Sequence, residues 1–247
     1  MPTDTLGSLR EKARYILEIR YPPLVQAFDR RGKVLEVLFP RFRQKLEHWR
    51  TENVEVTIAN NLESPSRAIS VGHLRSSIIY EDPGTRQEFL DDSRAFIAGL
   101  EEVFPEGLKT ITRLGFRSIG IVKHETASSF DEVFASVRSR FLHPQLPTTL
   151  RFTDCAVTLE QENCRVMVGP VKTGEDWVRN AFAKPESNVP AFGIGLDVDC
   201  YSHDLDCGSP GALAAAARAL GELALKIEEE TIAGVLGHAH GEEAQQG

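Results

Sequence analysis

The order in which strand-like and helix-like patterns follow one another constrains the fold of this chain more than any other feature. Apolar and polar residues alternate over several short segments: 15–21, 54–58, 67–80, 108–122, 150–159, 165–171 and 192–201. Alternation with a period of two is typical of strands that bury one face. Because several of these segments follow one another without a helix between them, we expect largely antiparallel sheets.

Helical periodicity predicts the elements that back these sheets. Residues 24–49 carry apolar side chains at three- and four-residue steps, with interruptions near Gly32 and Pro40. Two signals predict where most of the remaining helices begin. One is a serine or threonine cap with glutamate three residues later, and the other is a proline at the first helical position. These helices are expected after Thr85 (with Glu88), after Ser129 (with Glu132), at 176–182 and after Ser209.

Together these patterns predict an α+β fold, with antiparallel sheets backed by helices and a long C-terminal helix. The 247 residues are enough for one large domain or two small ones. If the strand at 108–122 serves both halves, the plan is two β-α-β-β units side by side. We expect an N-terminal half over 1–124, a C-terminal half over 125–237 and a disordered tail over 238–247.

The apolar segments are too short to cross a membrane, which takes about 20 apolar residues. The first fifteen residues also lack the apolar region of a signal peptide. We therefore expect a cytoplasmic protein that does not associate with membranes, in which Cys155, Cys164, Cys200 and Cys207 are reduced thiols.

Four charged residues are expected to neutralise one another across neighbouring strands. Arg113 and Arg117 share one face of the strand at 108–122, and Asp197 and Asp199 share one face of the strand at 192–201. We predict that these residues form a structural ion-pair network. In a functional alternative, the two arginines flank Gly115 as a basic slot that clamps a carboxylate or phosphate of a ligand.

A metal site is a further alternative, carried by ligand-type residues near the end of the same strand. Cys200, His203 and Cys207 are the candidate zinc ligands, but the sequence lacks the second ligand pair that a structural zinc site needs. A metal-dependent enzyme would instead use Asp197 and Asp199 with His203. The expected state is a chain without a metal or cofactor, since the sequence also lacks nucleotide-binding loops and a nucleophile elbow.

The segment 30–50 suggests a nucleic-acid module as another alternative. Residues 1–50 hold eleven Lys and Arg against six Asp and Glu, whereas the whole chain has a net charge of -8. An acidic body repels phosphate backbones, so a nucleic acid would have to bind this segment through Arg41, Arg43 and Lys45. The ordinary role of such residues is the solvated face of an amphipathic helix.

Three segments together resemble a sporadically distributed and largely uncharacterised bacterial family. They are I-L-E-I-R-Y-P-P at 16–23, I-T-R-L-G-F-R-S-I-G at 111–120 and G-L-D-V-D-C-Y at 195–201. Members of that family carry an E-I-R-F-like opening, an R-L-G-L-R-Y-I-N strand and a D-I-D-V-Y strand in the same order. The chain departs from the second motif, because Ser118 and Gly120 stand where the family has tyrosine and asparagine. The resemblance implies that the charged residues of the second and third motifs matter to the sheet.

These observations favour a binding or accessory protein over an enzyme. The expected partner is another protein or a small ligand, recognised by a face or groove of the sheet. The sequence carries no signal for an oligomeric state.

Overall fold

The computed structural model describes residues 10–124, 126–141, 155–184 and 189–236. The expected tail at 238–247 and the first residues of the expected strand at 150–159 lie outside these ranges. Within them, no helix is long and apolar enough to cross a membrane.

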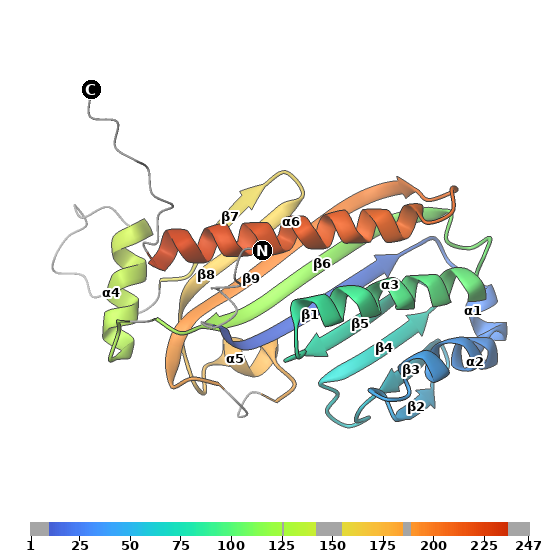
Figure 1. Ribbon diagram of the computed structural model, residues 1–247, viewed down its shortest axis with the longest axis horizontal. Coiled ribbons are helices and arrows are strands. Elements are labelled where there is room, and N and C mark those ends of the chain that lie inside the picture. Colours follow the sequence, from blue (N-terminus) through green and yellow to red (C-terminus); the bar gives the residue numbers. More distant parts are fainter. Residues whose placement is uncertain (1–9, 125, 142–154, 185–188, 237–247) are drawn as a thin grey trace.

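The described strands form one antiparallel sheet, in the order β2-β3-β4-β5-β1-β6-β9-β8-β7 (Figure 1). Its strands are β1 (Arg10–Arg20), β2 (His48–Thr51), β3 (Glu55–Ala59), β4 (Arg67–Gly72), β5 (Arg75–Glu81), β6 (Thr110–Val122), β7 (Val157–Gln161), β8 (Cys164–Lys172) and β9 (Phe192–Asp206). The α+β class with a largely antiparallel sheet is confirmed.

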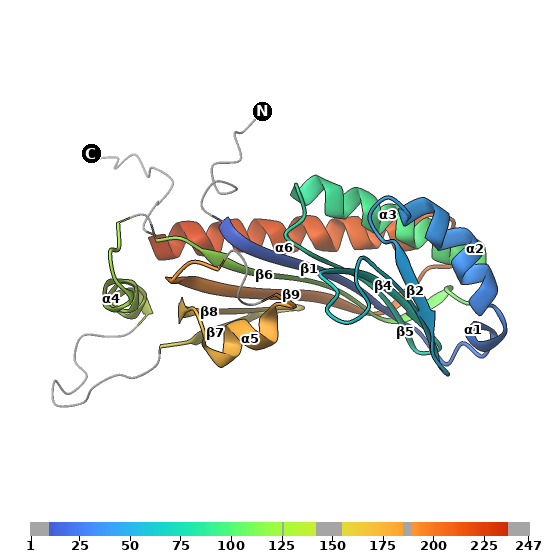
Figure 2. The same ribbon diagram turned by 90° about the horizontal axis from the view of Figure 1, so that it is seen from below.

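The helices lie on both sides of the sheet, but unequally. They are α1 (Gln26–Asp29), α2 (Arg31–Phe42), α3 (Arg86–Val103), α4 (Phe130–Phe141), α5 (Asp176–Ala181) and α6 (Ala212–Leu236). Figure 2 shows α2, α3 and α6 on one side of the sheet and the short α5 on the other. The sheet face opposite α3 and α6, called here the polar face, is covered by a described helix only at α5.

The main core fills the space between the sheet and the large helices. Tyr15, Leu17 and Ile19 alternate along β1 and are almost completely buried there. Their neighbours Phe89 of α3 and Phe116 of β6 pack edge to face, with ring centroids 5.7 Å apart. This burial explains the period-two pattern in the sequence, since the residues between these positions point to the polar face.

The strand β6 joins the two expected halves. It pairs with β1 on one side and with β9 on the other. The strands on the β1 side all come from 1–124, and those on the β9 side all come from 125–237. The expected boundary at 124/125 falls between β6 and α4, so β6 belongs to the first range and pairs with β9 of the second.

Some local predictions are confirmed and others are wrong. The hydroxyl of Thr85 accepts a hydrogen bond from the backbone N–H of Glu88 at 3.0 Å, so the cap of α3 is present. The expected single strand at 67–80 is instead the hairpin of β4 and β5, which turns after Gly72. The expected helix does not reach Trp49, which lies on β2 and pairs with Ile58 of β3.

The expectation of four reduced thiols is wrong for two of them. Cys164 and Cys200 stand directly opposite one another on β8 and β9 and form a disulfide. Cys200 also pairs with Phe116, so the bridge lies on the helix-covered side of the sheet. Cys155 and Cys207 are not part of a disulfide.

Candidate functional site

The four predicted network residues share the polar face of β6 and β9. In the register of these strands, Arg117 stands opposite Asp199, and Arg113 stands opposite His203. Because side chains alternate along a strand, Asp197 and Arg113 project from the same face as Arg117 and Asp199. The sheet therefore brings together the charges that the sequence only placed on separate strands.

The ion pairs run diagonally between the two strands. Arg117 donates to both carboxylate oxygens of Asp197, from Nε at 2.7 Å and from Nη2 at 2.5 Å. Arg113 donates from Nη2 to both oxygens of Asp199, at 3.0 and 3.2 Å. The predicted cross-strand ion pairs are thus confirmed, each with two hydrogen bonds to one carboxylate.

Glu18 of β1 belongs to the same network, and the sequence reasoning missed it. Its Oε1 lies 3.3 Å from Nη1 of Arg113 and 2.7 Å from Nε of Arg20. Its position between Ile16 and Arg20 in the alternating pattern was the available signal for the polar face. The missing information was that β1 and β6 are neighbours, which places Glu18 opposite Gly115.

Gly115 gives the guanidinium of Arg113 room to lie between Glu18 and Asp199. A Cβ atom at position 115 would lie 2.6 Å from Nη1 and 3.1 Å from Cζ of Arg113. The space above this glycine, which the sequence suggested as a ligand slot between two arginines, is therefore occupied by Arg113 itself.

Pairing and burial shift the pKa values of two members of this network. The hydrogen bonds from Arg117 to Asp197 raise the pKa of the Arg117 guanidinium above its ordinary value. Burial raises the pKa of Asp199, and this effect exceeds the lowering by Arg113 and Arg117. Burial therefore disfavours the charged form of Asp199, and the two neighbouring arginines reduce this cost.

A cavity of about 400 Å³ opens beside the Arg117–Asp197 pair, and we call it the α5 pocket. It is lined by Arg117, Arg165, Met167, Trp177, Asp197 and Asp199. A Cβ atom at Gly195 would lie 3.1 Å from the Trp177 ring, so the glycine lets the indole approach the strand. The pocket combines a charged floor with one aromatic and one thioether side chain.

The metal-ligand candidates do not converge. Cys200 is bound in the disulfide on the helix-covered side, whereas His203 is exposed on the polar face, where its Nδ1 donates to the carbonyl of Thr112. Asp197 and Asp199 are engaged by arginines, which repel a cation. In the part of the chain that the structure describes, no group of three or more His, Cys, Asp and Glu is arranged to hold a metal ion.

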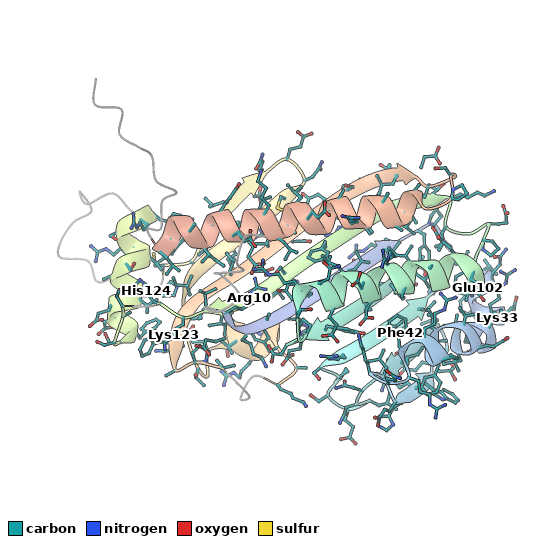
Figure 3. All side chains as sticks on the ribbon, in the orientation of Figure 1. Arg10, Lys33, Phe42, Glu102, Lys123 and His124 are labelled. Carbon is teal, nitrogen blue, oxygen red and sulfur yellow. A yellow bond between two sulfur atoms is a disulfide. The ribbon has the colours of Figure 1, made fainter. Side chains whose placement is uncertain are left out.

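The basic residues considered for nucleic acid lie at α2, on the opposite side of the molecule from α5. Arg41 forms an ion pair with Glu102 of α3. Lys45 donates to Asp92 at 2.6 Å and lies 3.1 Å from Glu88. Figure 3 shows Glu102 at the end of α3 that lies beside α2. Acidic residues of α3 thus neutralise two of the three candidates, and Arg43 is exposed.

Comparison with protein-family models and with curated proteins gives no match for this chain.

Proposed function

We propose that this chain is a binding protein without catalytic activity, which recognises a small ligand or a polar segment of another protein on its polar face. The observation that carries this proposal is the α5 pocket, where a charged floor adjoins Trp177 and Met167. Binding sites for small molecules commonly combine apolar walls with a few placed polar groups. The pocket has the volume of such a site, with Trp177 and Met167 as its apolar part and four charged side chains as its polar part.

Arg165 is the side chain in this pocket with the most freedom to meet an anionic group. Its side chain is 62% exposed, and its contact with Glu160 is 3.7 Å long. Arg117, by contrast, is held by two short hydrogen bonds to Asp197. We expect the ligand to place a carboxylate or phosphate on Arg165 and an apolar or aromatic part on Trp177.

The contact between His124 and Ser136 supports a structural rather than a catalytic role for this serine–histidine pair. The Nδ1 of His124, which is labelled in Figure 3, accepts a hydrogen bond from the backbone N–H of Ala127 at 3.3 Å. In the neutral ring the proton is then on Nε2, which donates to the Ser136 hydroxyl at 3.0 Å. A histidine in this tautomer cannot take the serine proton, so the pair lacks the general base that a nucleophilic serine needs.

Trp177 supplies the experiment, because the chain has only one other tryptophan, Trp49. In a Trp49→Phe variant, the fluorescence of Trp177 reports directly on the pocket. Aromatic carboxylates and phosphates are titrated against this variant. We expect saturable changes in fluorescence, and about tenfold weaker binding when Arg165→Ala is added, from the loss of one charge-assisted contact.

The matched control is Arg218→Ala on α6, which removes an arginine that is also more than half exposed, from the opposite side of the sheet. It is expected to leave the affinity unchanged. Binding that is weakened equally by both substitutions, or no saturable change with any such compound, contradicts the proposal.

The cytoplasmic location expected from the sequence stays a proposal. Disulfides are rare in reducing compartments, so the redox state of Cys164 and Cys200 in the cell bears on it directly. Because both side chains are buried, cells are lysed directly into denaturant with an alkylating reagent before mass spectrometry: a labelled pair supports the cytoplasm, and an unlabelled, disulfide-bonded pair contradicts it.

Membership in the bacterial family that the three motifs resemble is also a proposal. The motifs at 16–23, 111–120 and 195–201 fall mainly on β1, β6 and β9. These three strands are consecutive in the sheet. This arrangement supports the resemblance, because motifs that are distant in sequence contribute to one surface.

A further inference from the structure

Basic residues occupy directly paired positions on four neighbouring strands, at the end of the polar face away from the α5 pocket. Arg75 of β5 stands opposite Arg20 of β1, which stands opposite Arg113 of β6, which stands opposite His203 of β9. Like charges directly opposite one another destabilise a sheet. This row therefore opposes stability locally, although the whole chain is acidic.

The carboxylate of Glu18 lies within 4 Å of all three arginines of the row. Glu18 accepts from Arg20, lies 3.3 Å from Arg113 and lies 3.8 Å from Arg75. Asp199 adds a second negative charge, through Arg113. The cluster thus holds three guanidinium groups and two carboxylates, since Asp197 is engaged by Arg117.

The excess positive charge lies at the open side of the cluster. The side chains of Glu18 and Arg113 are each 19% exposed, whereas those of Arg20 and Arg75 are 50% and 62% exposed. Within the described residues, the side chain of Arg75 makes no hydrogen bond, and the side chain of Arg20 donates only from its Nε. Because at least half of each side chain is exposed, an oxyanion can reach the remaining guanidinium donors of these two residues.

We propose that Arg20 and Arg75, backed by Arg113, bind a short oligophosphate-type anion. Adjacent strands are about 4.8 Å apart, so the row from Arg75 to His203 spans about 14 Å, which suits a few linked phosphates. Guanidinium groups bind phosphate oxygens through pairs of hydrogen bonds. A long polyanion is disfavoured, because it would extend over the acidic remainder of the chain.

This site deepens the proposed binding function but does not depend on the α5 pocket, which neither Arg20 nor Arg75 lines. Calorimetric titrations at low salt without divalent cations test it, with inorganic triphosphate, pyrophosphate and orthophosphate as ligands. We expect affinity to fall in that order. Arg20→Ala combined with Arg75→Ala should weaken triphosphate binding at least tenfold, and both side chains are exposed enough for the variant to fold.

The matched control is Arg218→Ala combined with Lys226→Ala, which removes the same charge from exposed positions on α6. It is expected to change the affinity less than twofold. An equal loss in both double variants means a non-specific charge effect and overturns the proposal, as does an absence of triphosphate binding to the unmodified protein.

Glu18→Gln gives an outcome in the opposite direction. Removing this carboxylate releases the arginines that it holds, so triphosphate should bind several-fold tighter. Glu222→Gln on α6 is the control with the same change of charge, and it should have no such effect. Tighter binding in both variants, or in neither, contradicts the site.

Two further ligands separate the possible sources of the phosphates. ATP binding about as tightly as triphosphate indicates that the phosphate chain alone is recognised, whereas much tighter ATP binding indicates that the nucleoside is recognised as well. Either outcome supports the oligophosphate site. A single-stranded oligonucleotide that binds far more tightly than ATP, and equally in the Arg20/Arg75 variant, contradicts it.

Discussion

Replacing Gly115 with alanine should break the charge network of the polar face without removing a charge. The new Cβ would lie 2.6 Å from Nη1 of Arg113, at the flexible end of that side chain. The guanidinium can move away at little steric cost, but it then leaves its position between Glu18 and Asp199. The cost of the substitution is therefore the loss of these two ion pairs.

The magnitude follows from the burial of the partners. The side chains of Arg113, Glu18 and Asp199 are each less than one third exposed. Hydrogen bonds to charged groups contribute about 1.5–3 kcal/mol to stability. Allowing for partial screening by solvent, we expect a loss of about 1–3 kcal/mol for the network. Replacing glycine with alanine within a strand stabilises the folded state by about 0.5–1 kcal/mol, which offsets part of this loss.

Urea denaturation, followed by circular dichroism, measures this effect in a double-mutant cycle with Arg113→Ala. Gly115→Ala should lower the free energy of unfolding by about 1 kcal/mol, and by no more than ~2.5 kcal/mol, in the wild-type background. In the Arg113→Ala background the same change should be neutral or stabilising, because the guanidinium is gone. An equal cost in both backgrounds would falsify the reasoning, since the methyl group would then collide with something other than Arg113.

Three further outcomes are expected from single substitutions. Burial raises the pKa of Tyr21 to about 12, and the unfolded chain loses this proton above about pH 10. The free energy of unfolding should therefore fall by up to ~2.7 kcal/mol between these pH values, and a pH series of urea melts should show a smaller fall for Tyr21→Phe. Thr85→Ala should cost about 1 kcal/mol through the lost cap of α3, and Thr85→Ser should restore it in the same melts. Cys164→Ala should cost about 4 kcal/mol relative to the oxidised protein, because the bridge to Cys200 closes a 36-residue separation; equal stability of oxidised wild type and variant would contradict this.

Local patterns were enough to predict most elements of this fold. The alternation along β1 and the capping residues Thr85 and Ser129 act through neighbours in sequence, so they are visible without a structure. The wrong predictions arose where local signals are ambiguous. Two short strands such as β4 and β5 resemble one long strand when the turn between them lacks proline and asparagine, as it does at His73 and Leu74.

The charge network was predictable only in part. Arg113, Arg117, Asp197 and Asp199 lie on strands of clear alternation, which assigned each pair to one face. Glu18 was missed because no local signal shows that β1 lies beside β6. The disulfide was missed for the same reason, since the pairing of Cys164 with Cys200 depends on the register of β8 against β9.

Arginine labelling of the native protein tests most directly whether the polar face is an open recognition surface. The protein is treated with phenylglyoxal, and the modification rate of each arginine is followed by mass spectrometry. We expect Arg20, Arg75 and Arg165 to react about as fast as the exposed Arg218, and Arg113 to react far more slowly. Protection of Arg20, Arg75 and Arg165 in the ligand-free protein would mean that another segment or a second copy of the chain covers this face, and it would contradict both proposed binding sites.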